Sequence, residues 1–191
     1  MISDNPDVIY AIDADDQLVE LSSSWEAFAQ KNDGGVGLHP RSVLGQSLWS
    51  YVRGRSLQTL YHDMIAAVRR TGRTCEFRFR CDSPVLRRYM HMRVDSMPDR
   101  HVQFRSCNFR VERRDVPLYV QAVSTGDHHL QRCSICNLFE LPDGAWSDAA
   151  DAVTRGQAMN QDRPLRIIWS VCEPCRETLR GEISQVGATS R

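Results

Sequence analysis

The sequence lacks any apolar run of the roughly 18–20 residues that a membrane-spanning helix requires. It also lacks net charge, because its 24 basic and 24 acidic residues cancel, so little long-range attraction to nucleic acid or to a membrane surface is expected. The opening MISDNPDV is acidic and polar, whereas a signal peptide needs a basic stretch followed by an apolar one. We therefore expect a cytoplasmic protein without a membrane partner.

Motifs for common enzyme chemistry are also missing. The sequence has no glycine-rich phosphate loop with its lysine, no nucleophile elbow and no protein-kinase signature. We therefore expect a chain that acts by binding and not by catalysis.

Cysteine is present in an odd number, seven, which fits poorly with a fully paired disulfide scaffold. Four of the seven form two Cys-x-x-Cys pairs, Cys133/Cys136 and Cys172/Cys175. One such turn places two thiolates on one ion, and two turns complete the tetrahedral shell that zinc prefers. Cytosolic thiols stay reduced, so spaced pairs there more often hold metal than form disulfides. The sequence therefore predicts a structural Zn²⁺ site with these four ligands.

Other interpretations of the four cysteines stay open. Oxidation of the thiols could release the metal, as in a redox switch, the same four thiolates could hold iron instead of zinc, or the pairs could be metal-free. His128 and His129 lie close enough before the first pair to compete for the ion, although four cysteines already satisfy it. Cys75, Cys81 and Cys107 fall in a predicted strand region, where free cysteine behaves as a small apolar residue.

The first part of the chain combines strand and helix patterns. DVIYAID and LVELS, around the turn ADDQ, predict a hairpin over 7–22, and SSSWEAFAQKNDGG predicts a short helix around 24–32. RSVLGQSLWSYV offers one or two helical turns at most. A longer helix is predicted from about 55 to 71, where one helical face collects Leu57, Leu60, Tyr61, Met64, Ile65 and Val68.

Beyond this helix the period of the pattern changes from 3.6 to 2, which predicts antiparallel strands in TCEFRFRCD, RRYMHMRVD and HVQFRSCNFRVE. Arg78 and Arg80 are expected on the polar side of the first strand, and the arginine-rich sector 69–114 is interpreted chiefly as a solvated sheet face. The alternation slips near Ser106 and Cys107, which predicts a bulge there.

This order of elements resembles a PAS domain, a sensory fold in which a five-stranded antiparallel sheet packs against helices. The resemblance is carried by VIYAIDADDQLVELSSSWEAFA, by VLGQSLWSYV and by the run from EFRFRCDSP to MHMRV. It implies an α+β PAS-like domain over 1–114, with helices on one face of the sheet and the longest helix across it. It also implies an internal pocket for an unidentified small molecule, lined by Tyr61, Met64, Phe77, Phe79, Met90, Met92 and Phe104. Ordinary core packing is the alternative interpretation of these residues.

The C-terminal stretch resembles a small cysteine-rich tail found on some bacterial PAS proteins and sensor kinases. The matching residues are Cys133, Cys136, Gly144, Trp146, Cys172 and Cys175. One departure is the closing turn CEPC, in which proline stands at Pro174 and not directly after the first cysteine. We expect a linker over 115–132, a zinc-ribbon-like or treble-clef-like module with a four-cysteine zinc site over 133–182, and a flexible tail over 183–191.

The spacer of 35 residues between the two pairs must fold on its own. Asp143 and Gly144 form a turn signal, Ser147 could cap a helix through Val153, and LRIIWSV predicts a strand that enters the second pair. The second pair itself is expected to open a helix, whose N-terminal end favours thiolates.

Together these features predict a non-enzymatic bacterial sensory, signal-transduction or adaptor protein. The PAS-like domain would bind a small ligand or a signalling partner and form a homodimer, while the zinc module supplies a rigid interaction surface. A nucleic-acid-binding transcriptional regulator is an alternative, although residues 133–180 carry no dense basic cluster. A thiol-based redox or zinc switch is another.

Overall fold

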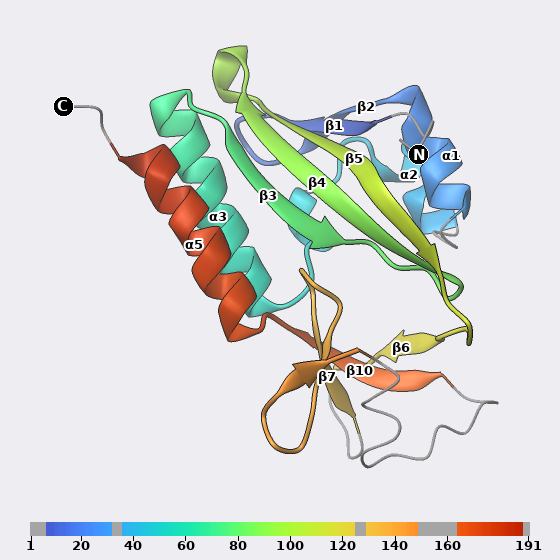
Figure 1. Cartoon of the computed structure of the whole chain (residues 1–191). Coiled ribbons are helices and arrows are strands. Elements are labelled where there is room, and N and C mark those ends of the chain that lie inside the picture. Colours follow the sequence, from blue (N-terminus) through green and yellow to red (C-terminus); the bar gives the residue numbers. More distant parts are fainter. Residues whose placement is uncertain (1–6, 32–35, 125–128, 149–163, 189–191) are drawn as a thin grey trace.

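The computed structural model of the chain describes residues 7–31, 36–124, 129–148 and 164–188. Two sheets and two long helices dominate the fold (Figure 1). The larger sheet is formed by the N-terminal part of the chain, the smaller one by the C-terminal part, and the last helix returns from the smaller sheet to the larger one.

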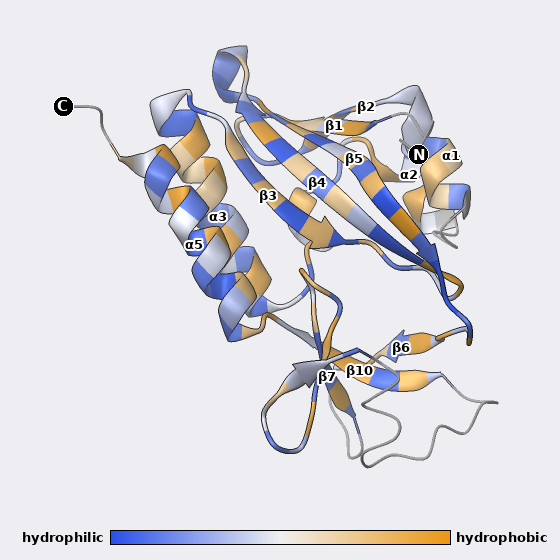
Figure 2. Ribbon diagram, viewed as in Figure 1, coloured by the Kyte–Doolittle hydropathy of each residue, from blue (hydrophilic) through white to orange (hydrophobic). Residues whose placement is uncertain are grey.

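The first sheet consists of β1 (Val8–Ile12), β2 (Leu18–Leu21), β3 (Cys75–Arg80), β4 (Leu86–Ser96) and β5 (Val102–Arg113). Its spatial order is β2-β1-β5-β4-β3, and all four pairings are antiparallel. Hydrophobic and hydrophilic residues alternate along β4 and β5 (Figure 2), and Val94, Val102 and Phe104 are fully buried. The predicted α+β class and five-stranded antiparallel sheet are thus confirmed.

Helical structure fills the chain between β2 and β3. It comprises α1 (Ser23–Lys31), a 3-10 turn at Val36–Leu38, α2 (Pro40–Val43), a second 3-10 turn at Leu48–Ser50, and α3 (Arg55–Thr71). The long helix α3 has the predicted bounds, and Leu60, Met64 and Val68 on its predicted apolar face are buried. It contacts β4 and β5. Gly72 ends α3 with a left-handed φ of 68°, a conformation that glycine adopts without strain.

The second sheet consists of β6 (Val120–Ala122), β7 (Leu130–Cys133), β8 (Phe139–Glu140), β9 (Trp146–Ser147) and β10 (Leu165–Ser170). Its order is β6-β10-β7-β8-β9. β10, the strand predicted from LRIIWSV, runs parallel to both β6 and β7. Ser147 belongs to β9, while residues 149–153 of the helix predicted there lie outside the described residues.

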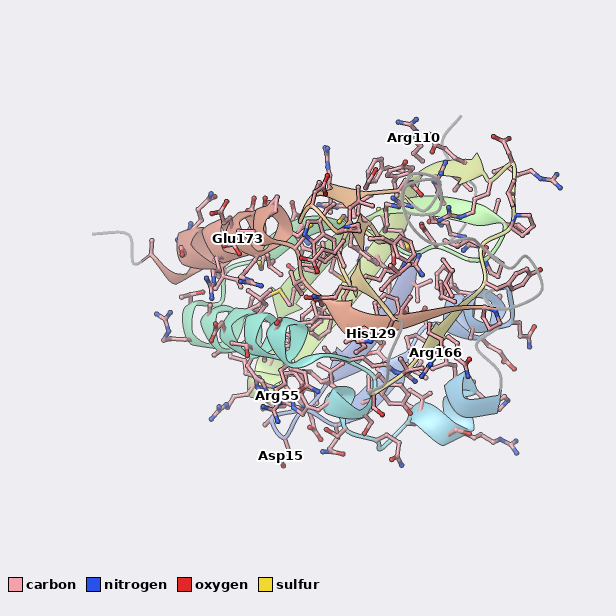
Figure 3. All side chains as sticks on the ribbon, turned by 90° about the horizontal axis from the view of Figure 1, so that it is seen from below. Asp15, Arg55, Arg110, His129, Arg166 and Glu173 are labelled. Atoms are coloured by element: carbon pink, nitrogen blue, oxygen red, sulfur yellow. The ribbon has the colours of Figure 1, made fainter. Side chains whose placement is uncertain are left out.

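The last helix, α5 (Glu173–Gly187), lies side by side with α3 and also contacts β3. Figure 3 shows the two helices from below, with Arg55 at the start of α3 and Glu173 at the start of α5. Leu179 and Val186 of α5 are buried in the same cluster as α3 and the first sheet. The helix continues to Gly187, and Val186 is buried near its end. Residues 183–187 of the segment 183–191, which we expected to be a flexible tail, therefore belong to α5.

A buried group of charges joins the two sheets. Asp82, with a side chain only 2% exposed, lies just beyond β3 and forms ion pairs with Arg80, Arg114 and Arg132. The last two N···O distances are 2.6 and 3.6 Å. Asp148, beside β9, also pairs with Arg80 and Arg114. Desolvation lowers the pKa of Arg132 to about 10, and the charge of Asp82 opposes that shift.

Two expectations for the first sheet are wrong. Arg80, expected on a solvated face, is 9% exposed, because residues of the C-terminal part cover the end of β3. The bulge in β5 lies at Phe109 and not at Ser106 and Cys107, since the β4 neighbours Tyr89 and Met90 pair with Arg110 and Asn108 and leave Phe109 between them. A slip in alternation identifies the bulged strand, but only the pairing identifies the extra residue.

Replacing Asp82 with Asn is expected to destabilise the fold by about 3–5 kcal/mol, because buried guanidinium groups lose their shared counter-charge. Urea denaturation would register this change as a lower midpoint with an unchanged slope. Glu76→Gln is the matched control: it removes an exposed carboxylate that pairs with the exposed Arg93, so the midpoint should barely move. Equal midpoints for the two variants would contradict the structural role of Asp82.

Candidate metal centre

The first cysteine pair lies in a tight turn between β7 and β8. Cys133 is the last residue of β7, and its sulfur accepts hydrogen bonds from the backbone N–H groups of Ile135 at 3.4 Å and Cys136 at 3.5 Å. Asn137 closes the turn with a left-handed φ of 59°, and its N–H donates to the Cys133 carbonyl at 3.0 Å. The turn thereby brings the sulfurs of Cys133 and Cys136 into one cluster.

The second pair lies where β10 passes into α5. Cys172 is the N-cap residue of α5, Pro174 lies in the first turn, and Cys175 follows directly. Proline is favoured there because the first N–H groups of a helix have no intrahelical acceptor. The prediction that this pair opens a helix is confirmed, and the partial positive charge at the helix start favours nearby thiolates.

Parallel pairing of β7 with β10 brings the two pairs together across the 35 residues that separate them. The register places Cys133 beside Ser170, and the Ser134 N–H donates to the Ser170 carbonyl at 2.8 Å. Because the two strands are parallel neighbours, the segments that follow them begin at the same edge of the sheet. The turn after β7 and the helix start after β10 therefore meet there.

The four sulfurs of Cys133, Cys136, Cys172 and Cys175 all lie within 4.8 Å of one another. The sulfurs of Cys136 and Cys172 are 3.7 Å apart. Zinc with Zn–S bonds of about 2.3 Å would hold sulfurs about 3.8 Å apart in a tetrahedron. All seven cysteines of the chain are free, so nothing ties these thiols up in disulfides. The four residues predicted from the two motifs form one candidate metal site.

Electrostatics show why four ionised thiols in this cluster would require a cation. Hydrogen bonds, chiefly from the thiols of Cys136 and Cys175, hold the pKa of Cys133 far below its ordinary value. The contact with Cys133 raises the pKa of Cys136 to about 12 and also raises the pKa of Cys175. The first thiolate therefore opposes ionisation of its neighbours, as like charges at close range do. A divalent cation removes this repulsion, so four thiolates fit a metal ion.

Other candidate ligands stand apart from the cluster. Among the described residues the group that could hold an ion contains the four cysteines and not His129, while His128 lies outside the described residues. Cys75 is buried in the core of the first sheet, and this burial raises its pKa to about 11. It serves as the small apolar residue that the strand pattern predicted.

The residues predicted to line a ligand pocket lie on the inner side of the first sheet and on α3. Met64, Met90 and Phe104 are essentially inaccessible to solvent. The ring of Tyr61 is parallel to that of Phe104 at 6.3 Å and lies edge-on to Phe77, also at 6.3 Å. Burial raises the pKa of Tyr61 to about 12. These side chains pack against one another, and ligand binding among them stays a prediction.

A link between the metal centre and the first sheet was not foreseen. The backbone N–H of Arg80 donates to the Ile135 carbonyl at 2.7 Å, and the side-chain amide of Asn137 donates to the Arg80 carbonyl at 2.7 Å. The turn that carries Cys133 and Cys136 is therefore fastened to the end of β3. The sequence holds one signal for it, an asparagine directly after the second cysteine, since asparagine tolerates left-handed backbone and bonds to nearby carbonyls.

No protein-family model matches the chain, and no curated protein matches it. Within the described ranges, none of the helices has the length and apolar character that crossing a bilayer demands. The fold and the cysteine cluster are thus the observations from which function must be inferred.

Metal affinity is expected to fall as the pH is lowered. Because the pKa of Cys136 is raised to about 12, this thiol holds its proton at neutral pH, and an incoming ion must displace it. Each displaced proton weakens binding about tenfold for every pH unit of acidification. Competition with a chelator between about pH 6 and 8 measures the slope. Cys107→Ser, a substitution outside the cluster, should keep the wild-type slope, and a pH-independent affinity would contradict the expectation.

Proposed function

We propose that this chain is a PAS-like sensory or adaptor module without enzymatic activity, in which a structural Zn²⁺ ion is held by Cys133, Cys136, Cys172 and Cys175. The observation that carries the proposal is the position of the cysteine cluster. Cys133 and Cys172 are buried in the same hydrophobic cluster as α3 and the first sheet. The metal centre is thus part of the sensor-like body and not a separate appendage.

Zinc suits a structural role because it has no redox chemistry and accepts four thiolates in a tetrahedron. When bound, it cross-links the β7–β8 turn to the start of α5. The second sheet has a small core of its own: Leu118, Phe139, Leu141 and Ile167. Metal binding supplies on the order of 10 kcal/mol of folding free energy to small units of this kind. Iron in the same four thiolates is the competing occupant.

The sensory part of the proposal is supported by the architecture of the first sheet. Its five antiparallel strands, the helical segment between β2 and β3, and the contact of α3 with β4 and β5 agree with the PAS resemblance. A small molecule or protein partner that changed the packing of Phe77 or Tyr61 would act on β3 and α3, and both elements adjoin the metal centre through Arg80 and α5.

A homodimer through the PAS-like domain is part of the proposal, with a signalling protein as the further partner. Phe109 and Val111 on β5 are 47% and 43% exposed, and contact with a second chain would bury them. Arg80, Arg114 and Arg132 are buried in ion pairs and cannot reach phosphates, so a nucleic-acid-binding regulator, the alternative, would have to use exposed arginines such as Arg105 and Arg110.

Elemental analysis with native mass spectrometry tests this function. We expect one zinc per chain and a dimer in the wild-type protein, because the four thiolates form one site and the sheet exposes apolar side chains. Cys133→Ser should lose the metal and unfold at lower denaturant concentration, whereas Cys107→Ser should keep both properties. A wild-type protein that is metal-free or monomeric, or a Cys133→Ser variant with wild-type stability, would contradict the proposal. A coloured protein that contains iron would show that iron and not zinc occupies the site.

A further inference from the structure

We propose that Cys175 is a modification site: among the four metal ligands, its thiolate is the one that a hydroperoxide oxidises first. The inference rests on the proposed metal site and concerns its regulation. The four sulfurs share one ion, but the fold gives them different exposure and different hydrogen bonds.

Solvent reaches the cluster from the side of Cys175. Cys133 is 0% exposed and Cys172 is 3% exposed, so their sulfurs are closed off. Cys175 is half-buried and lines a surface cavity of about 150 Å³ together with Phe77, Ile135 and Leu179. A single water needs only about 10–15 Å³ of such space. A small hydroperoxide therefore fits into the cavity that Cys175 lines, without a change in the fold.

Backbone hydrogen bonds protect the first cysteine pair and not Cys175. The Cys133 sulfur accepts from the N–H groups of Ile135 and Cys136, and the Leu138 N–H bonds to the Cys136 sulfur. Within the described residues no backbone N–H donates to the Cys175 sulfur. A hydrogen bond to a thiolate ties up an electron pair and lowers its nucleophilicity, so of the two half-buried ligands Cys175 keeps more available electron density than Cys136.

The proposed reaction balances with a hydroperoxide as the oxidant. The Cys175 thiolate attacks one peroxide oxygen, an S–O bond forms, the O–O bond breaks, and the departing oxide takes a proton to become water or an alcohol. The sulfur is oxidised by two electrons to a sulfenic acid. The thiolate of a second ligand then attacks that sulfur, an S–S bond forms, and hydroxide leaves. Two of the four ligands are thereby lost and the ion is released.

Zinc release from loaded protein during peroxide treatment, followed with a chromogenic chelator, tests the inference. Cys175→His keeps a fourth zinc ligand that cannot form a sulfenic acid, and we expect release about tenfold slower than in the wild type. Cys136→His is the matched comparison, because it also replaces a half-buried ligand with histidine: when the release rate with peroxide is divided by the rate without peroxide, this ratio should fall much less in Cys136→His than in Cys175→His. Thr178→Phe narrows the cavity while all four cysteines remain, and it should also slow release.

Mass spectrometry after trapping with a sulfenic-acid reagent gives an independent readout, in which the first label should appear on Cys175. A first label on Cys136, or equal slowing by the two histidine variants, would overturn the inference while leaving the metal site intact. Wild-type protein that carries no metal would overturn the proposed function as well, so the two failures are distinguishable.

Discussion

The parallel pairing of β7 with β10 is the constraint on which the C-terminal part of the structure depends. Its register sets Cys133 beside Ser170, so that two turns separated by 35 residues meet at one edge of the sheet. Parallel pairing requires a long crossover and gains little from local contacts, which makes such a register costly to form from an unfolded chain. An ion bound by the four clustered sulfurs would offset this cost, because metal binding rewards only the register that brings them within reach. The ladder and the cysteine cluster thus stabilise each other.

The charges around Asp82 act in a different way, because a buried ion pair adds little net stability over apolar packing of the same volume. These charges instead specify how the two sheets are placed against each other. Asp82 follows β3, whereas Arg114 follows β5 and Arg132 belongs to β7, so one carboxylate forms ion pairs with residues of both sheets. A shift of one sheet against the other would leave buried guanidinium groups without a counter-charge. The rings of Phe139 and Trp169 lie 5.2 and 5.5 Å from the Arg132 guanidinium carbon and limit its movement further.

Features with a short sequence period were predictable and features that depend on distant pairing were not. The apolar face of α3 and the alternation in β3, β4 and β5 follow from spacing alone, and two Cys-x-x-Cys motifs identify the four metal ligands because so few side chains bind zinc in that pattern. Arg80 was assigned to the wrong environment because alternation tells which side of a strand a residue occupies, and not what covers that side. The docking of α5 on α3 and the bulge at Phe109 depend in the same way on neighbours far along the chain.

Besides the buried charges around Asp82, two contacts connect the cysteine cluster to the first sheet, and their energies differ. The two hydrogen bonds at the end of β3, from Arg80 to Ile135 and from Asn137 to Arg80, contribute about 0.5–1.5 kcal/mol each. Burial of Leu179 and Val186 where α5 lies against α3 and β3 contributes about 1.5–3 kcal/mol for each side chain. Helix packing is therefore the stronger of these two attachments. The cysteine cluster is thus attached to the first sheet unevenly: through hydrogen bonds at the end of β3, and more strongly through the packing of α5 against α3 and β3.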